Sequence, residues 1–558
     1  MLKLYHFIIL VVISFLFFCQ TAISNQEYQE QLIRVGISSS DFNDLEYSST
    51  TLTADSAFSI TDLSLEKTLV NASPGAVYKI TVDSNGFNIY SSSKLLLSKI
   101  NGPVGVFSPG GHVRLLDIKR KGQVPAYRGK FEIVRAASSP AKLSVVNVLP
   151  LDEYLKGVVP NELPVSFGFE ALKAQAVAAR NYAVRPREKP YDQFDICDSV
   201  MCQVYFGYYT ENTLSNKAVE ETAGLVALYR GDVITALYSS APGGFTENYE
   251  FAFSDPKTKE FPCGSKPYLK GKCDIPGFDD LSDEESARKF YTSLPATHDV
   301  KSGYYRWDRY WTKSELEKEI NMSLAKLSNT KESEPFVNPA FSKTSNIGTL
   351  MDLKVLKRGV SGKAIDLKIT GSNGSWVVQK ELNIRRLLTK NGKALPSANI
   401  IINRATDPNG NLVGIKIVGG GFGHGVGMSQ YGASSMSSKG YKFDQILQHY
   451  YTGVALGTIP VFMYQQDFVV EPIKQVFYAP QGRGNLWIDS EGVSPIRLKI
   501  NGKDLVLKDP PGYCVKKNID ISSYLKTGAN EVIYMPPDSH MNEGMSVKLW
   551  IEVVKAKN

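Results

Sequence analysis

Alternating apolar and polar positions dominate the first quarter of the chain. VYKITVD (77–83), GFNIYSS (86–92) and KFEIVRA (130–136) carry an apolar side chain at nearly every second position, and Gly, Asn and Pro separate such segments. A period of two is typical of half-buried β-strands. The pattern predicts a β-rich N-terminal lobe over residues 25–145.

The pattern changes to helical at EALKAQAVAARNYAV (170–184). This segment is rich in alanine, lacks Gly and Pro, and places Glu170 early and Arg180 late, as the helix dipole favours. Ser166 is a candidate N-cap. LVALYRGDVITALYSS (225–240) then predicts a β-hairpin, and further strands are expected up to residue 460. We therefore expect one mixed region over 146–460.

A third pattern begins after Pro460. IRLKINGKDLVL (496–507) and SVKLWIEVV (546–554) again alternate. They predict a separate β-sandwich over residues 466–558. Its sequence resembles modules that are often attached to glycosidases, so sugar binding and structural support are both open roles for it.

The first 24 residues differ from the rest. Lys3 precedes the apolar run 7–18 and a small-residue site at 22–24, which is the order found in a secretory signal peptide. The alternatives are an uncleaved membrane anchor and a lipoprotein attached through Cys19, which the bulky Phe18 disfavours. We expect export to the cell envelope or the extracellular space, with anchoring in the membrane as the alternative.

The net charge limits the kinds of binding partner that we expect. The formal net charge of +7 is small for 558 residues and is spread along the chain. Nucleic-acid binding usually needs a dense basic patch, so we expect no nucleic acid and favour an anionic envelope surface. Export also makes disulfides plausible. Cys197–Cys202 and Cys263–Cys273 are the simplest pairs, with Cys514 left over.

One carboxyl group stands out in GVVPNELP (157–164). Glu162 follows two valines and precedes Leu163 and Pro164, on a segment expected to be a loop before the alanine-rich helix. Partial desolvation raises the pKa of a carboxyl group and favours the neutral form that a general acid needs. The alternative is an ordinary surface glutamate near the start of a helix.

Longer motifs point to a family. The stretches VVNVLPLDEYLKGVVPNELP, EALKAQAVAARNYA, CQVYFG, YSSAPGGFTEN and GGGFGHGVGMSQYGASSMSSKGYKFDQILQHYYTG occur in this order. Together they resemble the SpoIID/LytB family over residues 33–460. The resemblance implies an α+β fold: a β-rich, two-lobed SpoIID-like catalytic region with a few helices, followed by the C-terminal β-sandwich. It also implies peptidoglycan as the substrate.

The resemblance assigns roles to residues of the first motifs. Glu162 matches the catalytic acid of SpoIID proteins, which are lytic transglycosylases. Four residues of the following helix are candidate substrate contacts: Lys173, Gln175, Arg180 and Tyr182. Lys173 and Arg180 lie two turns apart on one helix face, so they could steer an anionic sugar or lower the pKa of Glu162. An ordinary solvated basic face is the alternative.

The glycine-rich segment 419–427 contains neither a dinucleotide-binding nor a P-loop motif. Its glycines permit close backbone approach, and the resemblance makes it a cleft wall. His424, Gly425, Ser429 and Gln430 are then candidate substrate contacts, although His424 could instead be a structural histidine.

The YSSAPGGFTEN motif adds Ser240 and Gly244 as candidate substrate contacts. Pro242 departs from the small residue usual before its two glycines. The hydroxyl groups of this motif could bind sugar or merely build the turn.

We expect no metal and no other cofactor. Some proteins that resemble this family hold zinc through two cysteines and two histidines around the CQVY stretch. Here Met201 stands where a histidine would precede Cys202, and the sequence has no histidine between residues 114 and 297. Two thiolates alone make a poor zinc site, so a disulfide or free thiols are expected at Cys197 and Cys202.

Two functions from different classes remain. A lytic transglycosylase cleaves the MurNAc–GlcNAc bond with one acid, whereas a hydrolase needs a second carboxylate, for which Asp152 and Glu153 are candidates. The rival is a non-catalytic protein that binds glycan and enhances a cell-wall amidase. The expected partners are therefore peptidoglycan glycan strands and a cell-wall amidase.

Overall fold

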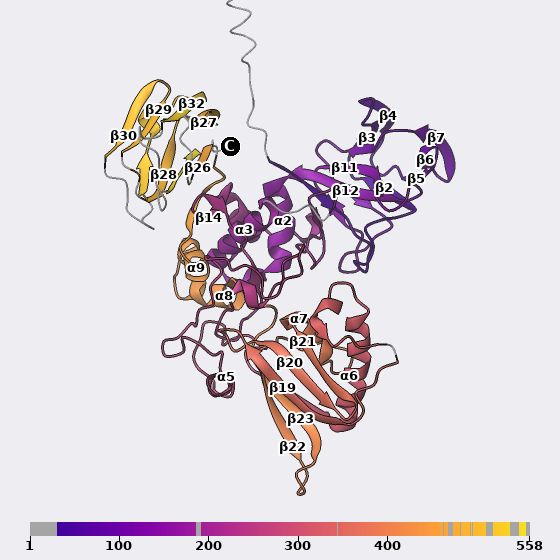
Figure 1. Cartoon of the computed structure of the whole chain (residues 1–558). Helices are drawn as coiled ribbons and strands as arrows, with labels where there is room; N and C mark the ends of the chain where they lie inside the picture. The colour runs from indigo at the N-terminus through magenta and orange to yellow at the C-terminus, as the bar shows by residue number, and fades with distance from the viewer. Residues whose placement is uncertain are drawn as a thin grey trace, which may run out of the picture.

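The computed structural model describes residues 31–185, 191–342 and 344–460, and within the tail 462–466, 473–479, 481–491, 493, 495–508, 517–535 and 546–553. The predicted signal segment and Cys514 lie outside these residues. The fold is α+β and rich in strands, as predicted (Figure 1). No helix in the described part of the chain is long and apolar enough to span a membrane.

The N-terminal lobe contains two sheets. The strands of the first, in sheet order, are β13 (Ile196–Cys197), β1 (Leu32–Gly36), β12 (Leu143–Pro150), β11 (Lys130–Arg135), β8 (Val104–Phe107), β3 (Phe58–Asp62) and β4 (Lys67–Ala72). Those of the second are β10 (Ala126–Tyr127), β9 (Val113–Leu115), β2 (Ser49–Ala54), β5 (Tyr78–Asp83), β6 (Gly86–Ser91) and β7 (Lys94–Ile100). Since β12 pairs with β1 and β11, the lobe runs past the predicted boundary at residue 145.

A helical core follows the lobe. Its helices are α2 (Leu151–Glu162), α3 (Phe169–Val184), α4 (Thr213–Glu221), α8 (Gln430–Ser438) and α9 (Phe443–Tyr450). Helix α3 contacts each of the other four, because its buried alanines let them approach on several sides. It begins after Gly168, so Ser166 is not its N-cap as predicted: Ser166 lies in a preceding 3₁₀ turn.

Short strands surround the helical core. The predicted hairpin is present as β14 (Leu225–Tyr229) and β15 (Asp232–Val233), and β25 (Ala455–Thr458) joins its sheet. A two-stranded parallel pair, β16 (Tyr238–Ser239) and β24 (Met428–Ser429), brings two of the quoted motifs together.

A third body is inserted between these two motifs (Figure 1, lower part). Its elements are α5 (Glu284–Tyr291), β17 (Trp307–Thr312), α6 (Lys313–Ser328), β18 (Val337–Asn338), β19 (Leu350–Arg358), β20 (Ala364–Gly371), β21 (Gly374–Gln379), α7 (Glu381–Leu387), β22 (Ile400–Thr406) and β23 (Leu412–Gly419). Helix α6 begins with a capping box at Thr312 and Glu315 and turns Leu316 and Ile320 into a hydrophobic core of this body's own. The region predicted as two-lobed therefore carries an additional body.

The predicted C-terminal β-sandwich is present as two four-stranded sheets. One contains β26 (Phe462–Gln466), β33 (Ser546–Val553), β28 (Gly484–Glu491) and β31 (Lys517–Asp520). The other contains β27 (Ile473–Ala479), β32 (Gly528–Met535), β29 (Ile496–Ile500) and β30 (Lys503–Leu507). Strand β26, which begins before the predicted start at residue 466, already pairs with β33 in this sandwich.

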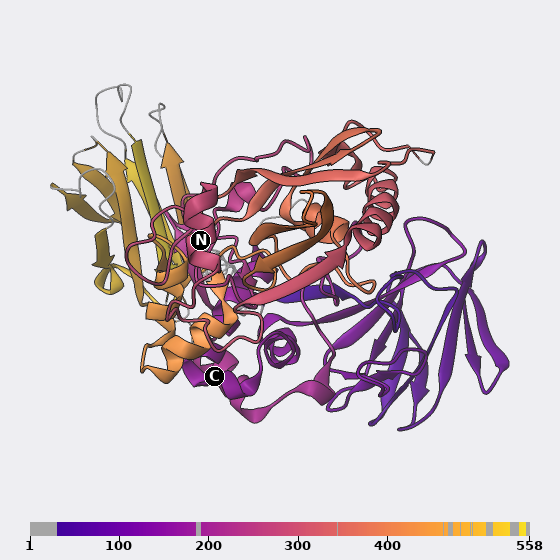
Figure 2. The same ribbon diagram turned by 90° about the horizontal axis from the view of Figure 1, so that it is seen from below.

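The sandwich and the N-terminal lobe lie on opposite sides of the helical core in both ribbon views (Figures 1 and 2). The sandwich packs on the β14–β15 hairpin. Arg230 and Lys548 form ion pairs across this contact, with Asp489 and Asp232 respectively, both at 2.7 Å.

Candidate functional site

Glu162 is the last residue of α2, not part of a loop as predicted. Helix α2 continues beyond Pro160 because a proline near a helix end removes only one backbone donor, and the N–H of Leu163 still bonds the carbonyl of Val159 at 3.0 Å. The helix thus places the Glu162 side chain at a fixed point beside the CQVYFG segment.

That segment holds the carboxyl group. The backbone N–H of Val204 donates to Oε1 of Glu162 at 2.7 Å. Burial raises the pKa of Glu162 to about 7, and the Val204 hydrogen bond opposes this rise only in part. Among the described residues no lysine or arginine pairs with this carboxyl group. A carboxylic acid that is half protonated near neutral pH is suited to donating a proton.

Helix α8, which begins just after the glycine-rich segment, reaches the end of α2. Nε2 of Gln430 donates to the backbone carbonyl of Glu162 at 2.9 Å and to Oε1 of Gln175 at 3.4 Å. Gln175 is fully buried, and its Nε2 has no hydrogen-bond partner among the described residues. The structure therefore joins three predicted site residues from three motifs into one cluster.

A tyrosine–glutamine network borders the same carboxyl group, and the sequence analysis did not single out its members. The hydroxyl of Tyr154 donates to Gln203 at 3.2 Å, and Gln203 in turn donates to the hydroxyl of Tyr238 at 3.2 Å. Burial, and then the nearby charge of Glu162, raise the pKa of Tyr238. The only available signal was that these residues fall within or beside the quoted motifs.

The parallel pair β16–β24 places further candidates next to this cluster. Ser239 aligns with Ser429, whose hydroxyl caps α8 by accepting from the N–H of Gly432 at 2.9 Å. The carbonyl of Ser240 accepts from the N–H of Tyr431 at 3.1 Å. Ser240 and Ser429 thus fix the start of the helix that carries Gln430.

His424 is held as a neutral ring. Its Nδ1 accepts from the N–H of Val426 at 3.1 Å, which leaves the proton on Nε2. Burial lowers the pKa of His424 to about 4, and Phe253 lies edge-on at 5.3 Å between ring centroids. His424 is therefore a neutral imidazole at physiological pH, which is a poor proton donor.

The glycines of the two motifs pack backbone against backbone. A Cβ on Gly243, which has a φ of +81°, would lie 2.8 Å from the carbonyl carbon of Gly420. Gly425 also joins the two motifs through its backbone, because its carbonyl accepts from the N–H of Glu247 at 2.8 Å. The N–H groups of Gly243 and Gly244 both donate to Asp299, at 2.7 and 3.2 Å.

Arg180 does not form the cationic face that was predicted. Its side chain is 1% exposed and bonds Asp152 at 2.8 and 2.9 Å and the carbonyl of Leu225 at 3.1 Å. Lys173 turns toward α4 and pairs with Glu221 at 2.6 Å. Neither side chain acts on Glu162, whose pKa is raised and not lowered.

The two alternative carboxylates, Asp152 and Glu153, both form ion pairs. Asp152 is the partner of Arg180, and Glu153 pairs with Lys156 at 2.8 Å and Arg128 at 3.2 Å. Tyr182, at the end of α3, packs under the guanidinium of Arg185. These ion pairs engage both alternative acids, whereas Glu162 forms no ion pair with another described residue.

The cysteines settle one alternative. Cys197 and Cys202 form a disulfide, as expected, and it anchors the segment that carries Val204. The suggested Cys263–Cys273 pair is wrong, because both thiols are free in the structure.

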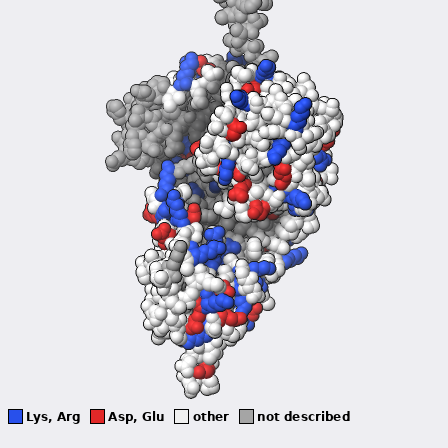
Figure 3. All heavy atoms as spheres, turned by 90° about the vertical axis from the view of Figure 1, so that its right-hand side faces the viewer, with Lys and Arg blue, Asp and Glu red and all other residues white. Residues whose placement is uncertain are grey.

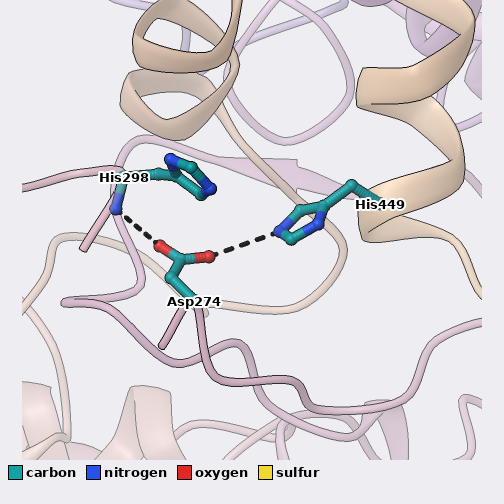
Figure 4. A group of neighbouring side chains, drawn as sticks. All are labelled: Asp274, His298 and His449. Carbon is teal, nitrogen blue, oxygen red and sulfur yellow. Dashed lines mark hydrogen bonds and ion pairs between the residues drawn. The ribbon is translucent and has the colours of Figure 1, made fainter. Parts of the chain in front are cut away.

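One group of side chains has the composition of a metal site and was not predicted. Asp274, His298 and His449 offer ligand atoms within 4.8 Å of one another (Figure 4). Asp274 already accepts from the N–H of His298 at 2.9 Å and lies 3.4 Å from Nε2 of His449. Ammonium groups of Lys439 and Lys272 lie 3.3 and 3.5 Å from the two Nδ1 atoms, and their charge disfavours a cation.

The sequence also matches known protein families, and one match covers residues that build this site. Residues 139–229, which include Glu162 and α3, match the family described as SpoIID, Stage II sporulation protein. An uncharacterized protein of Brachyspira hyodysenteriae is 30% identical over 312 residues, covering 56% of this chain and 67% of that protein. This chain belongs to the SpoIID family. Residues 258–427, which include most of the inserted body, match a domain of unknown function, DUF8618.

Two further relatives are characterised by name. Stage II sporulation protein D of Bacillus subtilis is 29% identical over 344 residues, covering 58% of this chain and 78% of that protein. The amidase enhancer of the same species is 32% identical over 308 residues, covering 54% of this chain and 40% of the relative. The match thus spans less than half of the amidase enhancer.

Proposed function

We propose that this protein cleaves peptidoglycan glycan strands between MurNAc and GlcNAc as a lytic transglycosylase in the cell envelope, after export. The observation that carries the proposal is the state of Glu162: an unpaired, desolvated carboxyl group with a pKa near 7, at the point where the family motifs converge. Such a group donates a proton at neutral pH without a metal or a second acid.

The reaction uses a single proton, which leaves Glu162 and later returns to it. Glu162 gives its proton to the glycosidic oxygen, and the bond from that oxygen to the anomeric carbon of MurNAc breaks. The 6-hydroxyl oxygen of the same MurNAc then bonds to the anomeric carbon, and its proton returns to the Glu162 carboxylate. No water is consumed, so the product ends in a 1,6-anhydro ring.

The ion pairs of Asp152 and Glu153 support this mechanism over hydrolysis. A hydrolase requires a second carboxylate facing the sugar as nucleophile or base. Both neighbouring candidates are engaged by Arg180 and Lys156.

The test uses purified protein and glycan strands freed of their peptides. Mass spectrometry should find fragments with anhydro ends, and Glu162→Gln should not produce them. Reducing ends in place of anhydro ends would indicate a hydrolase.

A second candidate function is enhancement of a cell-wall amidase, because the relative named amidase enhancer is 32% identical. In that case the protein yields no anhydro ends, but it raises the rate at which an added amidase releases peptides from sacculi. Glu162→Gln would leave that stimulation intact.

A further inference from the structure

The inserted body contains a pocket of about 1010 Å³ beside the glycine-rich segment. Its walls come from β17, the end of α7, the loop that follows α7, and β23. Its charged lining residues are Arg309, Arg385, Lys390, Lys393, Lys416 and Asp308. Lys and Arg side chains gather on this body next to the hollow below the N-terminal lobe (Figure 3). Five cations against one carboxylate make the pocket attractive to anions.

Two of the cations are left available. Three are engaged, in the pairs Lys416–Asp308 (2.8 Å), Lys390–Glu315 (3.0 Å) and Arg385–Glu381 (3.4 Å). Arg309 and Lys393 form no ion pair with a carboxylate among the described residues, and Nη1 of Arg309 donates to the backbone carbonyl of Asp308 at 2.7 Å. A planar guanidinium and an ammonium group in one pocket fit a ligand that carries carboxylates.

Three of the uncharged lining residues are aromatic and exposed. Tyr304, Tyr310 and Phe422 are 41%, 47% and 40% exposed, and the rings of Tyr304 and Phe422 lie 4.6 Å apart. Exposed rings grouped in one pocket commonly mark a binding site. Aromatic faces pack against the C–H faces of sugars, so the pocket combines contacts for apolar and anionic parts of one ligand.

A short stretch of chain joins the pocket lining to the cluster around Glu162. Phe422 exchanges backbone hydrogen bonds with Ala241 at 2.7 and 3.2 Å, in the segment that leads back to Tyr238. From Phe422 the chain needs eight residues to reach Gln430, a span of at most about 29 Å even if fully extended. A polymer bound at Glu162 can therefore extend to the pocket.

We propose that this pocket binds the stem-peptide carboxylates of the peptidoglycan strand whose sugars lie at Glu162. The proposal rests on the proposed function for its choice of polymer. The inserted body then selects strands that still carry peptides. Phosphate-rich wall polymers share the anionic chemistry, and the test separates them.

The test measures binding without cleavage, in the Glu162→Gln background. Sacculi are acid-treated to remove phosphate polymers, and half of them are then stripped of peptides by an amidase. Co-sedimentation gives the affinity of Glu162→Gln and of the same protein with Arg309→Ala and Lys393→Ala. The added pair should weaken binding to peptide-bearing sacculi roughly tenfold, because two charge-assisted contacts are lost, and should leave binding to stripped sacculi unchanged.

The matched control is Lys354→Ala with Arg386→Ala, which removes the same two charge types from exposed positions of the same body outside the pocket. It should bind like the parent. Lys393→Glu, at an exposed position, provides a second pocket variant that should also weaken binding to peptide-bearing sacculi.

Three results would overturn the proposal: equal loss on both kinds of sacculi, loss with the control pair, or no binding of the parent to the acid-treated, peptide-bearing sacculi. The proposed function fails separately, if unmutated protein never yields anhydro ends.

Discussion

The side-chain amide of Gln430 donates a hydrogen bond of 2.9 Å to the backbone carbonyl of Glu162, 268 residues earlier in the chain. The bond ties the first turn of α8 to the last turn of α2. The start of α8, just after the glycine-rich segment 419–427, therefore borders Glu162, and His424 within that segment is neutral at physiological pH.

Gln430→Ala removes this tie. The end of α2 gains freedom, so we expect anhydro-product formation to fall roughly tenfold, as mispositioning a catalytic group does. Gln448→Ala is the matched control, since Gln448 lies exposed on α9. Circular dichroism should find both variants folded. Equal rates in the two variants would show that the tie does not matter for activity.

Glu162→Gln tests the acid itself. The amide keeps the shape of the side chain and can still accept from Val204, but it cannot donate a proton as an acid. We expect activity on peptide-free strands to fall about 10²–10⁴-fold. Glu153→Gln should stay near the normal rate, because Glu153 serves ion pairs on another face. Normal activity of Glu162→Gln would place the acid elsewhere.

The pKa of Glu162 also predicts a pH dependence. The acid must be protonated, so kcat/KM should be level below about pH 7 and fall about tenfold per pH unit above it. A profile that rises through pH 7 would instead indicate a base.

Stability should follow the same group. Its folded pKa of about 7 exceeds the reference value of 4.5, so the folded state holds the proton more tightly, and stability is lost as pH rises through this window. Glu162→Gln should remove this loss and be more stable at pH 8 by about 1–3 kcal/mol in urea unfolding. At pH 4 the two proteins should differ little.

The sequence was sufficient for the outline of the fold. Alternation predicted the strands of the N-terminal lobe, and the alanine-rich helix and the hairpin within 225–240 are where the pattern placed them. These elements are decided by local periodicity, which a single segment carries. The inserted body was missed as a unit, because its boundary depends on which strands pair and not on what each strand looks like.

The site was predictable only in part. Glu162, Gln175 and Gln430 come together, and a resemblance of whole motifs was enough to group them. The prediction for Arg180 was wrong because helical spacing shows only which face of α3 a residue occupies. That α2 covers this face and pairs Asp152 with Arg180 is visible only in the tertiary structure. The Tyr154–Gln203–Tyr238 network needs three distant segments at once, and no spacing encodes it.

Asp152→Asn tests how much the ion pair between Asp152 and the buried Arg180 contributes to stability. Arg180 would keep its charge in a fully buried position with only carbonyl partners, so we expect about 2–4 kcal/mol of lost stability in urea unfolding. Glu153→Gln should cost less than about 1 kcal/mol, because its ion pairs are partly solvated. If Asp152→Asn stays fully stable but inactive, Asp152 is a second catalytic carboxylate and hydrolysis returns.

The C-terminal sandwich offers a test of a boundary. Deletion of residues 462–558 removes the whole β26–β33–β28–β31 sheet, whereas deletion of 466–558 leaves most of β26 without its partner β33. The contact with the core includes the ion pairs of Arg230 and Lys548, the packing of Trp550 against Gly231, and a contact between β25 and β33 in which the Thr458 hydroxyl donates to the carbonyl of Val553 at 3.4 Å. We therefore expect the shorter protein, ending at 461, to be soluble, to unfold cooperatively and to keep its activity on peptide-free strands.

The one ending at 465 should aggregate more, since an unpaired β-strand invites pairing between chains. Light scattering and thermal unfolding of the two compare them directly. If the protein ending at 461 is insoluble, the sandwich is part of the core fold and the ion-paired contact is stronger than its partly exposed charges suggest.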